Sequence, residues 1–163
     1  MYFAVYDSPV GRILLESDGD CLTGLWPDRD CPEEENRVPV IEKTIAWLDG
    51  YFRGENAPMD IPLNPKGTEF QKRVWGLLAD IPWGAVRTYG DLARDAATLL
   101  GKEKMSAQAV GQAVGANPIA ILIPCHRCVA AGGKLGGYAY GPEKKRWLLK
   151  HEGAIAGNLE ERV

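Results

Sequence analysis

The first 26 residues alternate between apolar and polar side chains, which is the period of strands that bury one face. Two polar segments rich in turn residues, DSPVG and SDGD, interrupt the alternation. It therefore predicts three short strands, at residues 2–6, 12–16 and 21–26. After a polar loop, the apolar positions of VIEKTIAWLDGYFRGE follow helical spacing. This order predicts a small antiparallel sheet with one helix packed on it.

A proline-rich segment separates this pattern from a second one. NAPMDIPLNPKG, residues 56–67, contains three prolines and predicts an extended linker. Beyond it, helical spacing recurs in four segments, residues 68–81, 89–100, 106–117 and 143–152. Thr68 and Ser106 are suited to cap the first and third of these helices. The apolar run that ends at Pro124 predicts a buried extended segment, and a glycine-rich loop follows it.

The two patterns predict the domain organisation. We expect an α/β N-terminal domain over residues 1–63, a mostly helical domain over residues 64–153, and a disordered tail over residues 154–163. The helices at 89–100 and 106–117 are joined by a short turn, which makes them a candidate helix-turn-helix with the second as recognition helix. That second helix is rich in Ala and Gly, so its backbone can approach another surface closely.

Composition and length fit a globular protein. The 163 residues are 45% apolar and 25% charged, close to the average of globular chains. No stretch approaches the about 20 apolar residues that span a membrane, and the N-terminus lacks the pattern of a secretory signal. Four cysteines without such a signal predict reduced thiols and a cytoplasmic location. We expect a monomer.

Charge is distributed unevenly along the chain, whose net charge is −3 at pH 7. Residues 1–63 carry five Lys or Arg and thirteen Asp or Glu side chains, a net charge of −8. Residues 64–153 carry thirteen and seven, a net charge of +6. The basic part predicts a polyanionic partner, although ordinary solvated surface charge explains the same numbers.

The segment ILIPCHRCV, residues 121–129, holds the strongest candidate chemistry. A thiol such as that of Cys125 has an ordinary pKa of about 8.5 and needs a base or a positive neighbour to react at neutral pH. His126 is adjacent, and Glu152 in the last predicted helix is a carboxylate able to orient it. The Cys125–Cys128 spacing also fits redox pairs and half of a zinc site. From the residues alone, nucleophile, redox thiol, metal ligand and buried structural thiol all stay open.

Longer stretches carry a resemblance to a known family. NPIAILIPCHRCVAAGGKLGGYAYG followed by EKKRWLLKHEG resembles the O6-alkylguanine-DNA alkyltransferases. Their ordered features are Asn-Pro, an apolar run, Pro-Cys-His-Arg, Gly-Tyr, and Trp-Leu-Leu with a following Glu, and all are present. FQKRVWGLLADIPWGAVRTYGDLA, upstream, is also similar to the family. The resemblance covers residues 68–153, and residues 1–63 fit in outline as the family's ribonuclease H-like domain.

The resemblance implies DNA repair, with double-stranded DNA containing alkylated bases as partner. An alkyl group would move from O6 of guanine, or less readily O4 of thymine, to the Cys125 sulfur, once per molecule and without cofactor or metal. His126 would take the thiol proton through a water, held by Glu152, after the damaged nucleotide is flipped out of the duplex. The implied base-binding residues are Tyr89, Asn117, Cys128, Tyr138 and Ala139, and the implied DNA-binding residues are Ser106, Ala107, Gln108 and Arg127.

Three positions depart from the family pattern. Gln108 stands where the family usually has an arginine that enters the base stack, which predicts weaker nucleotide extrusion. Tyr140 stands where glycine is usual, which predicts exclusion of large adducts. Some relatives hold a structural zinc in the N-terminal domain, but Cys21 and Cys31 have no histidine near them there, so we expect no zinc site; the sequence leaves a disulfide between them open.

Overall fold

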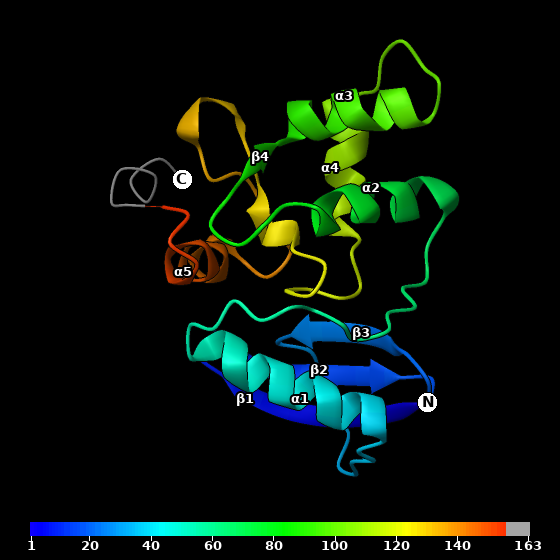
Figure 1. The fold of residues 1–163 in the computed structure, drawn as a ribbon, viewed down its shortest axis with the longest axis vertical. Coiled ribbons are helices and arrows are strands. Elements are labelled where there is room, and N and C mark those ends of the chain that lie inside the picture. Colours follow the sequence, from blue (N-terminus) through cyan, green and yellow to red (C-terminus); the bar gives the residue numbers. More distant parts are fainter. Residues whose placement is uncertain (156–163) are drawn as a thin grey trace. The chain divides into compact units, whose positions relative to one another are not determined.

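The structure of the protein is a computed structural model in which residues 1–155 are described (Figure 1). They form two compact units: residues 1–66 together with 118–122, and residues 67–117 together with those from Ile123 onward. Among the described residues, none of the helices combines the length and apolar character needed to cross a membrane. Each unit is considered by itself below.

The first unit is a three-stranded antiparallel sheet with one helix, as predicted. Its strands are β1 (Tyr2–Ser8), β2 (Gly11–Ser17) and β3 (Leu22–Pro27), in the order β1-β2-β3. Helix α1 (Pro39–Phe52) lies along the sheet, cyan against blue in Figure 1, and contacts all three strands. The strands and one helix face supply its buried core, which includes Ile13, Leu15, Leu25, Ile41 and Leu48.

Two distant segments pair with β3. Leu22 forms a parallel bridge with Leu63, and Leu25 forms one with Ile119. The linker expected before residue 67 is therefore attached to the sheet at its end, instead of being a free spacer. Hydrophobic periodicity did not predict these two bridges, since neither Leu63 nor Ile119 lies in an alternating pattern as long as a strand.

A tight turn follows the second of these segments. The N–H of Leu122 donates to the carbonyl oxygen of Ala120 at 2.8 Å, which closes a γ-turn around Ile121. Ile121 has φ 70° and is only 2% exposed. A left-handed backbone conformation is a genuine outlier for a β-branched residue. The chain thus carries a strained turn four residues before Cys125.

The second unit contains the four predicted helices and little sheet. They are α2 (Glu69–Ala79), α3 (Tyr89–Leu99), α4 (Ala107–Gly115) and α5 (Pro142–His151), with β4 (Arg87–Thr88), β5 (Cys128–Val129) and the 3₁₀ turns η1 (Cys125–Arg127) and η2 (Ala131–Gly133) between them. Thr68 and Ser106 cap α2 and α4 as expected, through hydroxyl groups that accept backbone N–H donors. Thr88 caps α3 in the same way.

Helices α2, α3 and α4 pack against one another to form the core of the second unit. The indole N–H of Trp75 on α2 donates to the carbonyl oxygen of Ala113 on α4 at 2.8 Å, in a buried position. The short strands β4 and β5 pair in parallel. Because Tyr89 follows β4 and Arg127 precedes β5, this pairing brings the start of α3 beside η1. Residues 154 and 155, assigned to the tail, instead pack against buried Val129, Leu135 and Leu149, and the rest of that tail lies outside the described residues.

Candidate active site

Two hydrogen bonds to one carbonyl shape the backbone that presents Cys125. The carbonyl oxygen of Ile123 accepts from the N–H of Cys125 and from Nδ2 of Asn117, each at 2.8 Å. Pro124, between them, has φ −79° and ψ 68°, the geometry of an inverse γ-turn. Asn117 is buried at the end of α4, so its amide ties this turn to the helix. Asn117, expected among the base-binding residues, is thus placed where its side chain holds the turn that presents Cys125.

His126 and Glu152 form a buried hydrogen-bonded pair. Nε2 of His126 lies 2.7 Å from Oε2 of Glu152, and neither side chain is exposed to solvent. Glu152 comes directly after α5, so a helix remote in sequence supplies the partner of η1. The other ring nitrogen, Nδ1 of His126, is buried and has no hydrogen-bond partner within residues 1–155. The carboxylate thus fixes Nε2 as the donor, and Nδ1 is left to accept a proton.

Arg127 occupies an interior position. Its Nε donates to Oε1 of Glu152 at 2.8 Å, and its Nη1 donates to the carbonyl oxygen of Ile81 at 2.6 Å. The side chain is 11% exposed. The resemblance implies that Arg127 contacts DNA. Both of these hydrogen bonds, however, direct its guanidinium to acceptors within the protein. This placement gives that expectation no support.

The local environment sets the protonation of these groups. Burial raises the pKa of the Cys125 thiol, an effect partly offset by the Asn117 amide and the Lys145 charge. Burial lowers the pKa of His126, and this outweighs the opposing influence of Glu152. Burial alone would raise the pKa of Glu152, but its bonds to His126 and Arg127 lower it to about 2. At neutral pH the site therefore holds a thiol, a neutral imidazole and a carboxylate.

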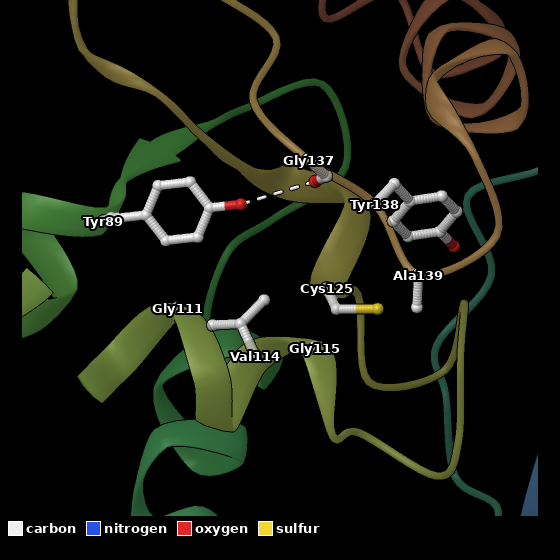
Figure 2. A pocket seen from close by; sticks show the side chains of 8 residues that line it. All are labelled: Tyr89, Gly111, Val114, Gly115, Cys125, Gly137, Tyr138 and Ala139. Carbon is white, nitrogen blue, oxygen red and sulfur yellow. Dashed lines mark hydrogen bonds between the residues drawn. The ribbon is translucent and has the colours of Figure 1, made fainter. Parts of the chain in front are cut away.

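A small pocket opens beside Cys125 (Figure 2). Its volume is about 140 Å³, below the roughly 300–1,000 Å³ of pockets for drug-sized ligands. Figure 2 shows the Cys125 sulfur pointing toward Ala139, with the Tyr89 ring on the other side of the pocket. The pocket is lined by Tyr89, Gly111, Val114, Gly115, Cys125, Gly137, Tyr138 and Ala139. A pocket of this volume admits only a small group against the sulfur.

Comparison with known proteins identifies the family. Residues 1–65 match "6-O-methylguanine DNA methyltransferase, ribonuclease-like domain", and residues 69–154 match "6-O-methylguanine DNA methyltransferase, DNA binding domain". The chain belongs to the 6-O-methylguanine DNA methyltransferase family. The family predicted from the Asn-Pro to Trp-Leu-Leu features is thus confirmed.

Relatives of this methyltransferase family align along nearly the whole chain. The methylated-DNA–protein-cysteine methyltransferase of Methanosarcina acetivorans is 43% identical, over 94% of this chain and 99% of that protein. The Haemophilus influenzae protein of the same name is 39% identical, over 93% and 86%. A crystal structure of Mycobacterium tuberculosis OGT in complex with DNA superposes with a TM-score of 0.80 at 38% identity, covering 98% of this chain and 97% of that one.

Tyr89, expected to bind the base, stands at the first position of α3. Its hydroxyl donates to the carbonyl oxygen of Gly137 at 3.4 Å, the bond dashed in Figure 2. Burial raises the pKa of Tyr89 to about 12, with further contributions from the nearby thiols. Gly136 has φ 77°, and a Cβ there would lie 3.2 Å from the Tyr89 ring. Glycine at this position therefore lets the loop close over the ring.

Lys145 is a site residue that sequence reasoning missed. Its Nζ donates to the carbonyl oxygens of Cys128 and Gly137, at 2.6 and 2.9 Å, and the residue is fully buried. Burial lowers its pKa to about 8. One signal was present in the sequence: Lys145, Leu148, Leu149 and Glu152 are spaced as one helical face.

The other expected residues separate into pocket and surface. Tyr138 and Ala139 line the pocket, whereas Cys128 is buried and its carbonyl oxygen accepts a hydrogen bond from Lys145. Tyr140 does not line the pocket; its ring lies 5.3 Å from that of Tyr138, edge to face. The side chains expected to bind DNA at the start of α4 are exposed, namely Ser106, Ala107 and Gln108.

The cysteines of the first unit do not form a linked pair. Cys21 and Cys31 are both free thiols, so the disulfide that the sequence left open is not formed. Within the described part of the chain, no group of three or more His, Cys, Asp or Glu side chains is arranged to hold a metal ion.

Proposed function

We propose that this protein repairs DNA by moving an alkyl group from O6 of guanine, and less readily from O4 of thymine, to the sulfur of Cys125. The observation that carries the proposal is the Cys125 thiol at the wall of a small pocket, next to the buried His126–Glu152 pair. The relatives named above are methylated-DNA–protein-cysteine methyltransferases. Each molecule acts once, because the thioether formed is stable.

The reaction transfers one proton and one alkyl group. His126 Nδ1 takes the thiol proton through a water, and Glu152 stabilises the imidazolium that results. The Cys125 sulfur attacks the alkyl carbon in line, so an S–C bond forms as the C–O6 bond breaks and its electron pair stays on the base. Because burial keeps Cys125 protonated at neutral pH, this base is needed for reaction.

Groups around the pocket are suited to hold the flipped base. Tyr89 reaches the ring nitrogen N3, the carbonyls of Cys125 and Cys128 accept from the exocyclic amine, and the N–H of Ala139 points at O6. Tyr138 forms a wall. Flipping costs a few kcal/mol for unstacking, and contacts in the pocket offset part of this cost.

We propose that α3 and α4 act as a helix-turn-helix on double-stranded DNA containing alkylated bases. The small residues of α4 allow it to enter the minor groove, with Ser106, Ala107 and Gln108 at its leading end. The protein acts as a cytoplasmic monomer. Because its affinity comes from phosphate contacts, it should depend on salt and not on sequence. The alternative function, a transcriptional regulator that uses the same two helices, would instead show a preferred DNA sequence.

The direct test is mass analysis of the protein after reaction. Wild type is mixed with a duplex carrying one O6-methylguanine, digested, and its peptides are weighed. We expect a single added methyl group on the peptide containing Cys125, and none in Cys125→Ser. Cys128→Ser serves as the second control, because alkyl transfer should persist while any thiol–disulfide activity is lost. Folded, DNA-binding protein with no methylated cysteine would refute the proposal.

A further inference from the structure

The guanidinium of Arg127 connects three separate parts of the second unit. It extends from η1, bonds Glu152 after α5, and bonds the carbonyl oxygen of Ile81 after α2. Arginine presents its donors in a rigid planar fork. Once two of those donors are engaged at 2.8 and 2.6 Å, the guanidinium has little freedom to rotate.

The two oxygens of Glu152 are divided between two partners. Oε1 accepts from Arg127 and Oε2 lies against His126. A carboxylate held at one oxygen cannot turn the other away from Nε2 of His126. The charge of Arg127 also compensates that of Glu152, whose side chain is fully buried; a buried carboxylate without a partner is strongly disfavoured.

We infer that Arg127 is a positioning residue for the proton transfer from Cys125 to His126. By fixing Glu152, it keeps the imidazole proton on Nε2 and leaves Nδ1 to receive the thiol proton. Its positive charge adds to the larger effect of burial in keeping the imidazole neutral before reaction. The charged and titratable groups near His126 are Glu152, Arg127, Lys145 and the Cys125 thiol. The expected effect of Arg127 on the reaction rate rests on the proposed alkyl transfer. Its expected effect on the tautomer and pKa of His126 does not.

Two substitutions separate the charge of Arg127 from its geometry. Arg127→Lys keeps the charge but cannot bond Glu152 and Ile81 through a planar fork, and Arg127→Gln removes the charge. We expect both to lower the single-turnover rate at saturating DNA about ten- to hundredfold, part of the 10²–10⁴ that acid–base catalysis contributes. The DNA concentration for half-maximal rate should not change. Arg87→Gln is the matched control, since it removes an arginine that is ion-paired with Asp95 in the same unit.

A second readout does not depend on catalysis. The chain has two histidines, so nitrogen NMR of the imidazoles gives two sets of signals, and His126→Gln identifies that of His126. Wild type should show the Nε2–H form of His126. The pKa of His126 should rise in Arg127→Gln and stay closer to wild type in Arg127→Lys.

The outcomes distinguish three cases. An unchanged His126 signal and rate in Arg127→Gln would overturn the inference. A rate loss caused entirely by weaker DNA binding would assign Arg127 to DNA contact and overturn it too. If wild type fails to transfer a methyl group but Arg127→Gln still shifts the His126 pKa, the positioning role stands and the proposed alkyl transfer fails.

Discussion

At the scale of single residues, Glu152 links the active site to stability. Its pKa is lowered to about 2, against an ordinary value of 4.5. A carboxylate with a lowered pKa stabilises the fold above the unfolded pKa and loses that contribution as pH falls toward the folded pKa. The difference corresponds to roughly 3 kcal/mol. We predict that the free energy of unfolding of wild type falls more steeply between pH 5 and 2 than that of Glu152→Gln, as measured by denaturant unfolding. Parallel slopes would contradict this.

Gln108 is the residue we expect to limit nucleotide flipping. It is exposed in the first turn of α4, so an arginine fits there without displacing core side chains. Gln108→Arg should raise the single-turnover rate on a methylated duplex more than on a methylated single strand, which needs no flipping. Gln112→Arg, exposed on the same helix, is the control for added charge alone. A slower duplex reaction in Gln108→Arg would show the prediction to be wrong.

Tyr140 is expected to restrict the size of the adduct. Because its ring packs edge to face on Tyr138, which lines the pocket, its effect passes through the position of Tyr138. Tyr140→Gly should raise the rate on O6-benzylguanine relative to that on O6-methylguanine, measured with duplexes that differ only in the lesion. Wild type reacting equally fast with both lesions would remove the basis for this expectation.

At the scale of elements, the turn around Ile121 has an unusual consequence for mutation. Alanine normally stabilises a position relative to glycine, but at φ 70° a Cβ costs about 1–2 kcal/mol. Ile121→Gly and Ile121→Ala both remove the buried side chain, so their difference isolates the backbone. We predict that Ile121→Gly is more stable than Ile121→Ala by about 1 kcal/mol, from thermal or denaturant unfolding. The reverse order would show that the positive φ carries no strain.

Local signals in the sequence predicted most elements, while contacts between distant residues were missed. Alternation and helical spacing located β1 to β3 and the five α-helices, because these patterns arise from burying one face. Thr68 and Ser106 marked helix starts through a local hydrogen bond. The pairing of Leu25 with Ile119 has no local pattern. Backbone N–H and C=O groups form this bridge, so no pattern of side chains in the sequence marks it.

The residues of the candidate site likewise divide into those that the sequence predicted and those that it did not. Cys125, His126 and Glu152 were found because the family resemblance assigns their roles, although the residues alone left the role of Cys125 open. Lys145 was missed and the interior hydrogen bonds of Arg127 were not foreseen, because a basic side chain is normally solvated. Only the fold shows that each reaches buried acceptors.

At the scale of the whole molecule, the uneven charge bears on DNA binding. Residues 64–153 carry thirteen basic and seven acidic side chains. Lys145, Arg127 and Glu152 have their charged groups inside the protein, which leaves eleven basic and six acidic side chains. The net charge available to phosphates from this part of the chain is therefore +5 and not +6. The same argument leaves the useful charge on the exposed basic residues of this part of the chain.

Lys102 and Lys104 are exposed in the connection between α3 and α4, next to the proposed recognition helix. If each contacts a phosphate, replacing both with alanine should weaken binding to all sequences alike and reduce the slope of log affinity against log salt by about 2. Titration of a fluorescent duplex from 50 to 200 mM salt measures this slope. Lys43→Ala, which removes an exposed lysine from α1, should leave it unchanged. An unaltered slope in the double variant would place these lysines off the DNA, and the phosphate contacts would then have to come from elsewhere in the basic part of the chain.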